Sequence, residues 1–251
     1  IRQIPEPLAW NREQNLGLFE YIQGRRLKPV EVTGDRVTEA VNFIIETNLK
    51  AGDARLAPAS EACFSLAQHY ATVDRRIQRL QSITNAEAND FVLHHLTPLW
   101  RKIEPALDKV AETVIPAGQR CISPSDFGFH NAHLHELGTL KFFDFEYAGT
   151  DDPAKLVCDF FCQPRLPASL EYWDAFTHDF ASKCGWNEAF LTRAATLLPV
   201  YQIKWCCIML NEFLRTEQQR REFSGKGEEL ESRQAHQLEQ AKAALTRIRQ
   251  D

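Results

Sequence analysis

The sequence predicts an α+β protein that is mostly helical and carries a small island of β structure near its middle. Through most of the chain, apolar residues recur at steps of three and four, which is the period of an amphipathic helix. Between residues 119 and 149 this period gives way to short apolar runs separated by turn residues, as is typical of strands. The first twenty residues show a hairpin pattern. These three observations favour a helical domain built around a central hairpin.

The composition limits the classes of protein to consider. A chain of 251 residues can bury a core as one large domain or as one domain with a small lobe, and 44% hydrophobic with 25% charged residues favours folding over disorder. The net charge of −5 predicts no nucleic-acid partner. No apolar run approaches the about 20 residues that span a bilayer, and the first ten residues lack the apolar core of a signal peptide. We therefore expect a cytoplasmic protein without a membrane partner, and the sequence does not indicate its oligomeric state.

The N-terminal third is predicted to be a hairpin followed by helices. Leu8-Ala9-Trp10 and L-G-L-F-E-Y-I flank the polar turn N-R-E-Q-N, and the connector Q-G-R-R-L-K-P follows. Two helical stripes come next, formed by Val37, Ala40, Val41, Ile44 and Ile45, and by Leu66, Tyr70, Val73, Ile77 and Leu80. A third helical segment, at about 86–114, has Leu107 and Val110 among its inward residues, and Pro98 predicts a break or kink in it.

After Pro116-Ala-Gly118 the predicted elements are short strands. We expect a loop, a strand at about 132–135, a turn at 137–139 and a strand L-K-F-F-D-F-E-Y at 140–147. Asp152 before Pro153 predicts the next helix, with aspartate at the N-cap and proline in the first turn. Further helices are predicted at 170–182, from 189 to about 223, and from about 228 to 249.

The seven cysteines have irregular spacing and mostly lie in apolar stretches such as K-L-V-C-D-F-F-C, which favours buried thiols in a reducing compartment. A zinc site is the alternative, because Cys158 and Cys162 follow the histidines at 130, 133 and 135. No C-x-x-C pair is present, and this makes zinc the weaker interpretation.

The centre of the chain places acidic side chains among aromatic ones, in S-P-S-D-F-G-F-H-N and then F-D-F-E-Y. Phosphoryl transfer needs a carboxylate near the attacking hydroxyl and oxygen ligands for metal ions, and Asp126, Asn131 and Asp144 supply both. A loop would let Asp126 and Asn131 face one cleft, and the hairpin would bring Asp144 there. Taken alone, Asp126 would instead be interpreted as an Asx-turn or capping residue. The presence of all three residues at this spacing favours a role in phosphoryl transfer over a purely structural one.

These motifs carry a resemblance. D-x-x-x-x-N followed by a strand with D-F-E resembles the catalytic loop and metal-binding strand of kinases. With the following A-G and D-D-P, the sequence resembles the aminoglycoside phosphotransferase and choline kinase-like family of small-molecule kinases, over about residues 4–215. L-F-E-Y-I-Q-G-R-R-L resembles the inter-lobe hinge of that family. The resemblance implies a protein-kinase-like fold: residues 1–27 are a remnant of the N-terminal β lobe with the hinge, and residues 28–251 are a mostly helical C-terminal lobe with a catalytic β-hairpin.

The resemblance also implies roles for single residues. Asp126 would be the base or orienter of the substrate hydroxyl, Asn131 and Asp144 would hold Mg²⁺, and Glu146 matches a second acidic metal-site position. The histidines outside this set are expected to have local roles, with His130 packing or hydrogen-bonding nearby. We expect His133 and His135 to face solvent, and Asp159 to lie on the surface, cap a helix or face the cleft.

The phosphate donor implied by the resemblance is ATP or GTP, with the base contacted by the backbone of Glu20 and Ile22. Two departures from the family stand out. Pro124 occupies the position, two residues before the aspartate, where the family often has histidine. No glycine-rich phosphate loop and no strand lysine precede the hinge, so the chain is expected to begin inside the N-terminal lobe.

The implied function is ATP- or GTP-dependent phosphorylation of a hydroxyl on a small molecule, such as a sugar, an amino-alcohol or an aminoglycoside-like compound. A catalytically degenerate nucleotide-binding or interaction protein is the alternative that the two departures favour. The presence of Asp126, Asn131 and Asp144 together disfavours it. A protein or glycated-protein kinase is a third possibility. The segments expected to line the substrate pocket carry no signature of the acceptor.

Overall fold

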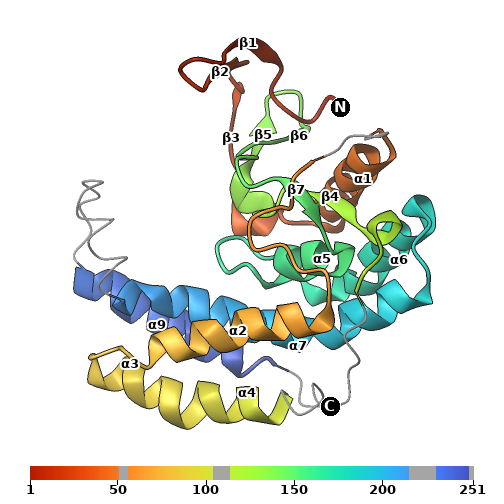
Figure 1. Ribbon diagram of the computed structural model, residues 1–251. Helices are drawn as coiled ribbons and strands as arrows, with labels where there is room; N and C mark the ends of the chain where they lie inside the picture. The colour runs from red at the N-terminus through yellow and green to blue at the C-terminus, as the bar shows by residue number, and fades with distance from the viewer. Residues whose placement is uncertain (51–55, 104–113, 215–229, 249–251) are drawn as a thin grey trace. The chain divides into compact units, whose positions relative to one another are not determined.

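The computed structural model describes residues 1–50, 56–103, 114–214 and 230–248, and it has the predicted α+β class (Figure 1). The chain divides into two compact units. The first contains residues 1–62 and 117–194, and the second contains residues 63–116 and 195–251. Every residue to which the sequence assigns a role in catalysis, nucleotide binding or metal binding belongs to the first unit.

The predicted N-terminal hairpin is confirmed. Strand β1 (Pro7–Asn11) pairs antiparallel with β2 (Leu16–Phe19). The turn between them forms because the Asn11 side chain accepts a hydrogen bond from the N–H of Gln14 at 3.1 Å. All residues of both strands are exposed, and they include large apolar side chains such as Trp10, at 70% exposure.

A three-stranded antiparallel sheet lies beyond the hairpin, in the order β3 (Gly24–Arg26), β5 (Ala132–His135) and β6 (Leu140–Phe142). The sequence placed residues 24–26 in a connector, but they pair with β5, where Gly24 faces His135. The expected strand at 140–147 is also corrected. It ends at Phe142, because Asp144 has a positive φ of 67° and this conformation cannot continue a strand.

Strand β4 (Cys121–Ser123) pairs antiparallel with β7 (Gly149–Asp151) and leads directly into the loop that contains Asp126. Gly149 permits the close approach of another segment. A Cβ atom there would lie 2.4 Å from the Ala57 carbonyl oxygen and 2.5 Å from the Ala59 nitrogen, so only glycine fits. This packing fixes the strand pair that supports the loop.

Helices of the first unit pack against strands β4 and β6. The helices of this unit include α1 (Gly34–Lys50), α5 (Pro153–Cys162) and α6 (Trp173–Cys184), with 3-10 turns at Pro29–Glu31, Ala117–Gln119, Phe129–Asn131 and Leu170–Tyr172. All five residues of the predicted α1 stripe are buried. The core beneath the site is aromatic. Phe43 stacks on Phe142 with ring centroids 4.6 Å apart, and Phe127 stacks on Phe160 at 5.2 Å.

Buried ion pairs fix the start of α5. Asp152 caps this helix as predicted, and it also binds the guanidinium of Arg193 through two hydrogen bonds of 2.8 Å. Lys155 lies 2.7 Å from Asp151 and 3.4 Å from Asp159, and all three side chains are buried. Asp159 is therefore neither a surface nor a capping residue, because the lysine one turn away neutralises it inside the protein.

The second unit is helical. Its helices are α2 (Leu66–Leu80), α3 (Ala86–Phe91), α4 (Thr97–Ile103), most of α7 (Glu188–Leu210) and α9 (Leu230–Leu245). The break predicted at Pro98 takes the form of a π-helical turn at Val92–Leu96, just before α4, since proline lacks the N–H that would continue the ladder. Leu107 and Val110 lie outside the described residues.

Polar and aromatic contacts join these helices. His69 Nδ1 lies 2.8 Å from the Tyr201 hydroxyl, and the rings of Tyr70 and Trp100 pack at 5.6 Å. The helix predicted to reach residue 223 ends at Leu210 and continues as a 3-10 turn at Asn211–Phe213. The rest of that prediction, at 215–223, lies in the undescribed part of the chain.

Most of the cysteines are buried, as predicted: Cys63, Cys121, Cys158, Cys206 and Cys207. Burial raises the pKa of Cys206 to about 12, so this thiol stays protonated at neutral pH. Within the described ranges, no group of three or more His, Cys, Asp or Glu side chains could hold a metal ion. The zinc alternative therefore finds no site there.

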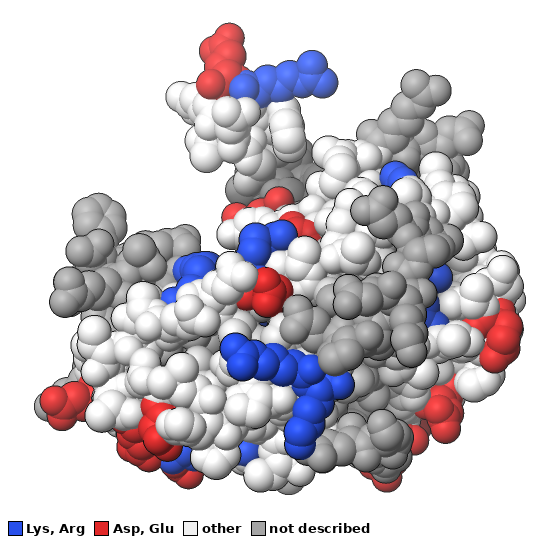
Figure 2. Space-filling model, turned by 60° about the horizontal axis from the view of Figure 1, so that its bottom comes forward, with Lys and Arg blue, Asp and Glu red and all other residues white. Residues whose placement is uncertain are grey.

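The surface carries both signs of charge. On the face shown in Figure 2, lysine and arginine side chains lie in small groups among acidic and neutral residues. None of the helices in the described part of the chain is long and apolar enough to cross a membrane.

Candidate active site

The loop after β4 starts with a tight turn that presents Asp126. The Ser123 hydroxyl accepts a hydrogen bond from the N–H of Ser125, and the N–H of Asp126 donates to the Pro124 carbonyl, both at 3.0 Å. Ser125 adopts a positive φ of 69°, which an L-residue holds only when its surroundings enforce it. The Asp126 side chain is 42% exposed, so it is accessible to a ligand.

Two phenylalanines anchor the loop in the core. Phe127 and Phe129 are 3% and 1% exposed, and both contact Phe160 of α5, at ring distances of 5.2 and 5.3 Å. The loop is therefore tied to a packed helix between Asp126 and Asn131, and the spacing of these two residues is held by aromatic packing.

Asn131 lies directly against Asp126, whereas the sequence predicted only that both would face one cleft. Its Nδ2 donates to the Asp126 carbonyl oxygen at 2.9 Å and to the carboxylate Oδ2 at 3.2 Å. Asn131 is only 8% exposed, so these bonds fix the orientation of its amide. Because the nitrogen is used inside the loop, Oδ1 is the atom that remains to bind a cation.

The hairpin brings Asp144 to the same place. The N–H of Phe143 donates to the Asn131 carbonyl at 3.1 Å, and Asp144 is the next residue. Asp144 is exposed, and its carboxylate has no hydrogen bond or ion pair within the described residues. Partial desolvation raises its pKa, and the nearby charges of Glu146 and Asp126 raise it further. The unneutralised charges favour a cation here.

Asp126 differs because its charge is stabilised. The pKa of this carboxyl is lowered, first by a hydrogen bond from His130, whose Nε2 lies 3.2 Å from Oδ1, and also by Asn131. The sequence assigned His130 only local packing or hydrogen bonding and did not identify its partner. The four-residue spacing between Asp126 and His130 within one short loop is the sequence signal from which this hydrogen bond could have been predicted.

Of the three predicted metal-binding residues, Glu146 has the least support from the structure. It is exposed and lies two residues after Asp144, where its charge raises the pKa of that carboxyl. Its side chain has no hydrogen bond or ion pair within the part of the chain that the structure describes.

The predicted hinge is connected to the hairpin of β5 and β6. Glu20 donates its backbone N–H to the Glu6 carbonyl at 2.8 Å, so its carbonyl is the backbone group that could meet a base. The Glu20 carboxylate lies 3.7 Å from Lys141 Nζ of β6. Ile22 is half-buried and precedes β3, which pairs with β5 (Figure 1). The hinge therefore leads into β3 and the loop of Asp126 leads into β5, and these are neighbouring strands of one sheet.

His133 and His135 do not simply face solvent, because both are half-buried. The His133 ring packs against Phe143 at 4.9 Å, and burial lowers its pKa. His135 Nδ1 accepts a hydrogen bond from the N–H of Leu137 at 3.1 Å and so supports the turn of the hairpin.

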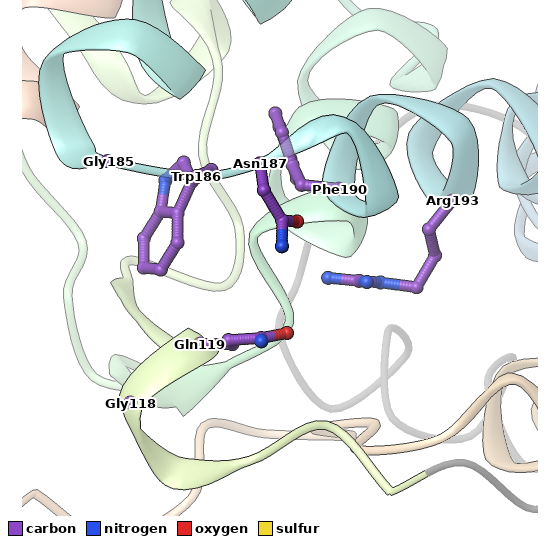
Figure 3. Close-up of a pocket in the computed structure, with 7 residues that line it drawn as sticks. All are labelled: Gly118, Gln119, Gly185, Trp186, Asn187, Phe190 and Arg193. Carbon is purple, nitrogen blue, oxygen red and sulfur yellow. The ribbon is translucent and has the colours of Figure 1, made fainter.

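A small pocket lies elsewhere in the first unit (Figure 3). Its volume is about 70 Å³, and it is lined by residues that include Gln119, Trp186, Asn187 and Arg193. Pockets for drug-sized ligands measure about 300–1,000 Å³, so this one is too small for a nucleotide. None of the predicted site residues lines it.

Solved structures show what fold this is. Three that resemble the chain are a choline/ethanolamine kinase family protein from Mesorhizobium loti, a choline kinase from Cryptosporidium parvum Iowa II and the aminoglycoside phosphotransferase APH(4)-Ia. Their sequence identities are 14%, 11% and 15%, with TM-scores of 0.56, 0.57 and 0.55. Each match covers 97% of this chain and 74%, 74% and 76% of the other chain. The predicted protein-kinase-like fold is thereby confirmed.

Searches at the sequence level give no match to the chain, either among protein-family models or among curated proteins. The likeness is therefore one of fold, and function has to be argued from the site.

Proposed function

We propose that the protein is a phosphotransferase that uses ATP or GTP to phosphorylate a hydroxyl group of a small molecule. The observation that carries this proposal is the hydrogen-bonded unit of Asp126, Asn131 and the backbone that leads into Asp144. Around one loop, this unit places a stabilised carboxylate (Asp126), a fixed amide oxygen (Asn131) and a second carboxylate (Asp144). The second carboxylate has no hydrogen-bond partner among the described residues. The fold, shared with choline kinases and an aminoglycoside phosphotransferase, supports the same reaction class.

Asp126 would orient the acceptor hydroxyl and take its proton. Its lowered pKa keeps it ionised at neutral pH, and its carboxylate is both accessible and held by two donors. In a largely dissociative transfer, little proton removal is needed early, so orientation is a substantial part of what this group contributes.

Asn131 and Asp144 would hold Mg²⁺, with Glu146 at the edge of the site. The residues fit such an ion, because Asn131 Oδ1 is the free end of a fixed amide. Desolvation first, and then the charges of Glu146 and Asp126, raise the pKa of Asp144, and a cation would offset this penalty on its ionised form. When bound, Mg²⁺ would neutralise charge on the phosphates. Two protein ligands are enough for an ion that keeps water and phosphate oxygens as its other ligands.

The nucleotide base would contact the hinge, through the Glu20 carbonyl and the Ile22 N–H. Structures of similar fold support a nucleotide here, since a thermostable mutant of APH(4)-Ia was solved with AMP-PNP and hygromycin B. The choline kinase LicA from Streptococcus pneumoniae was solved with AMP. The acceptor would be a sugar, an amino-alcohol or an aminoglycoside-like compound. The buried thiols agree with a reducing compartment, and we propose the cytoplasm.

The test is a transfer assay with the full-length protein, Mg²⁺, labelled ATP or GTP, and a panel of these three acceptor classes. Asp126→Asn should reduce turnover by about 10²–10⁴-fold, while nucleotide affinity measured by calorimetry changes little. Asp179→Asn makes the same chemical change at an exposed position of α6 and is the matched control.

Two results would count against the proposal. Nucleotide binding without transfer to any acceptor would favour the degenerate, non-catalytic class. A drop of several degrees in the melting temperature of Asp126→Asn, with binding and turnover lost together, would show that this aspartate is a structural loop residue.

A further inference from the structure

The further inference concerns how Asp126 is held in place. Its side chain is 42% exposed, and its backbone N–H is already used by the Pro124 carbonyl. Only hydrogen bonds to the carboxylate can therefore fix its orientation. The two donors within the described residues are His130 Nε2 and Asn131 Nδ2, both at 3.2 Å. Pro124, where a histidine was expected, has no side-chain donor to offer.

The two donors are not equivalent. Asn131 is a proposed metal ligand, so its amide takes part in nucleotide binding. The side chain of His130 is only 7% exposed, and it is not a proposed ligand of the metal or the nucleotide. His130 is thus the donor whose position is set by the protein alone.

Packing fixes the position of the His130 ring. A Cβ atom on Gly128 would lie 2.7 Å from His130 Nδ1 and 2.9 Å from Cε1, so the ring rests against a position where any side chain would displace it. Gln163 lies on the same side, with its Cγ 3.3 Å from that Cβ position. Gln163 is itself held by hydrogen bonds with the backbone of Arg165 and Leu166.

The hydrogen bonding of the ring also selects its proton position. His130 Nδ1 is buried and has no hydrogen-bond partner among the residues that the structure describes. A proton on Nδ1 would be a buried donor without an acceptor among the described residues, which is unfavourable. A proton on Nε2 points instead at a carboxylate, which is the stronger kind of hydrogen bond. The geometry therefore favours a ring that carries a proton on Nε2, directed at Asp126.

We propose that His130 is the positioning residue of this site: its imidazole ring, seated on Gly128, uses its Nε2–H to hold the Asp126 carboxylate toward the acceptor hydroxyl. The inference rests on the function proposed above. It assigns the donor that the sequence lacks at position 124 to a residue on the other side of Asp126, four positions along the loop.

The kinetic test compares variants that differ in one hydrogen-bond donor. His130→Phe keeps a flat ring but removes the donor, whereas His130→Gln keeps an N–H near the position of Nε2. We expect His130→Phe to lower kcat by about 10- to 100-fold with nearly unchanged nucleotide affinity, and His130→Gln to recover most of the loss. Gly128→Ala should resemble His130→Phe, because it displaces the ring. His178→Phe and His178→Gln, on the exposed side of α6, are the matched controls.

A double-mutant cycle on turnover distinguishes a role of His130 through Asp126 from a role in stability alone. If His130 acts through Asp126, then His130→Phe should cause no further loss of turnover in an Asp126→Asn background. Equal losses in His130→Phe and His130→Gln, or losses that add fully to that of Asp126→Asn, would overturn the proposal.

Nitrogen NMR of histidine-labelled protein decides the geometry without any activity. The expected spectrum of His130 shows a protonated Nε2 whose signal is shifted in Asp126→Asn. An unprotonated Nε2 would overturn the proposal. If the wild type transfers phosphate to no acceptor while this spectrum is found, the proposed function fails and the hydrogen-bonded pair stands.

Discussion

Asp126 and Asp144 are two carboxylates of one candidate site, and their hydrogen bonding and the direction of their pKa shifts are opposite. Asp126 receives hydrogen bonds from His130 and Asn131, and its pKa is lowered. Asp144 has no hydrogen bond or ion pair within the described chain, adopts a left-handed backbone conformation, and has a raised pKa. The first carboxylate is stabilised by the folded protein itself. The second retains a charge that something outside the protein would have to neutralise.

The difference shows how one loop can supply two chemical roles. A carboxylate that orients a hydroxyl has to be ionised and fixed before the substrate arrives, and internal donors provide this. A carboxylate that binds a metal has to keep its lone pairs free, and internal donors would compete for them. The contrast supports the assignment of Asp126 to the acceptor and Asp144 to the metal.

The largest effect that we expect from the difference between Asp126 and Asp144 is on nucleotide binding. Asp144→Asn keeps the size of the side chain and removes its charge, so Mg²⁺-dependent nucleotide affinity should fall by about 10- to 100-fold. Calorimetry of the full-length protein with and without Mg²⁺ measures the effect, with Asp179→Asn as the control. Equal nucleotide affinity in the presence and absence of Mg²⁺ in the wild type would show that Asp144 binds no metal.

A smaller effect concerns the backbone at Asp144. Asparagine tolerates a positive φ better than alanine does, and both remove the charge. At the φ of 67°, Asp144→Ala should therefore be less stable than Asp144→Asn by about 1 kcal/mol. Denaturant unfolding of both variants measures the difference. Equal stabilities would mean that the segment relaxes to an ordinary conformation, and that its left-handed turn does not fix the position of the carboxylate.

The smallest effects concern pH. The pKa of Asp126 is lowered from 3.8 by His130, by Asn131 and, more weakly, by Arg165. Folding therefore favours its ionised form, and the stability this contributes is present at neutral pH and lost as the pH falls through the folded pKa. The pKa of Asp144 is raised from 3.8 by desolvation, Glu146 and Asp126, against an opposing effect of His130. Its ionised form is therefore penalised at neutral pH, and the penalty disappears as the pH falls through its raised folded pKa.

Melting temperatures should show these opposite signs. At pH 7, Asp144→Asn should melt slightly above the wild type, because solvent screens the penalty on this exposed carboxylate, and the gap should close as the pH falls toward 3.8. Asp126→Asn should melt slightly below the wild type at pH 7, with a gap that closes only below pH 3.8. Shifts of the same sign in the two variants would remove the contrast on which the assignment of roles depends.

Local sequence patterns predicted much of the fold. The hairpin at β1 and β2, the buried stripe of α1 and the cap at Asp152 each depend on residues within one or two turns of one another. Their predictions were confirmed for that reason. The spacing of Asp126 and Asn131 is equally local, and the structure brings these two side chains together.

The chemical groups of the loop, and their separation along the chain, follow from the order of the amino acids alone. The pairing of β3 with β5, the end of β6 at Phe142 and the burial of Asp159 against Lys155 depend on how distant segments pack together. The tertiary structure also decided that Asp126 is held by His130 while Asp144 has no such donor in the described chain. The reason is physical: hydrogen-bond partners, desolvation and backbone strain depend on which segments meet in space, and the spacing of residue types along a chain does not specify those meetings.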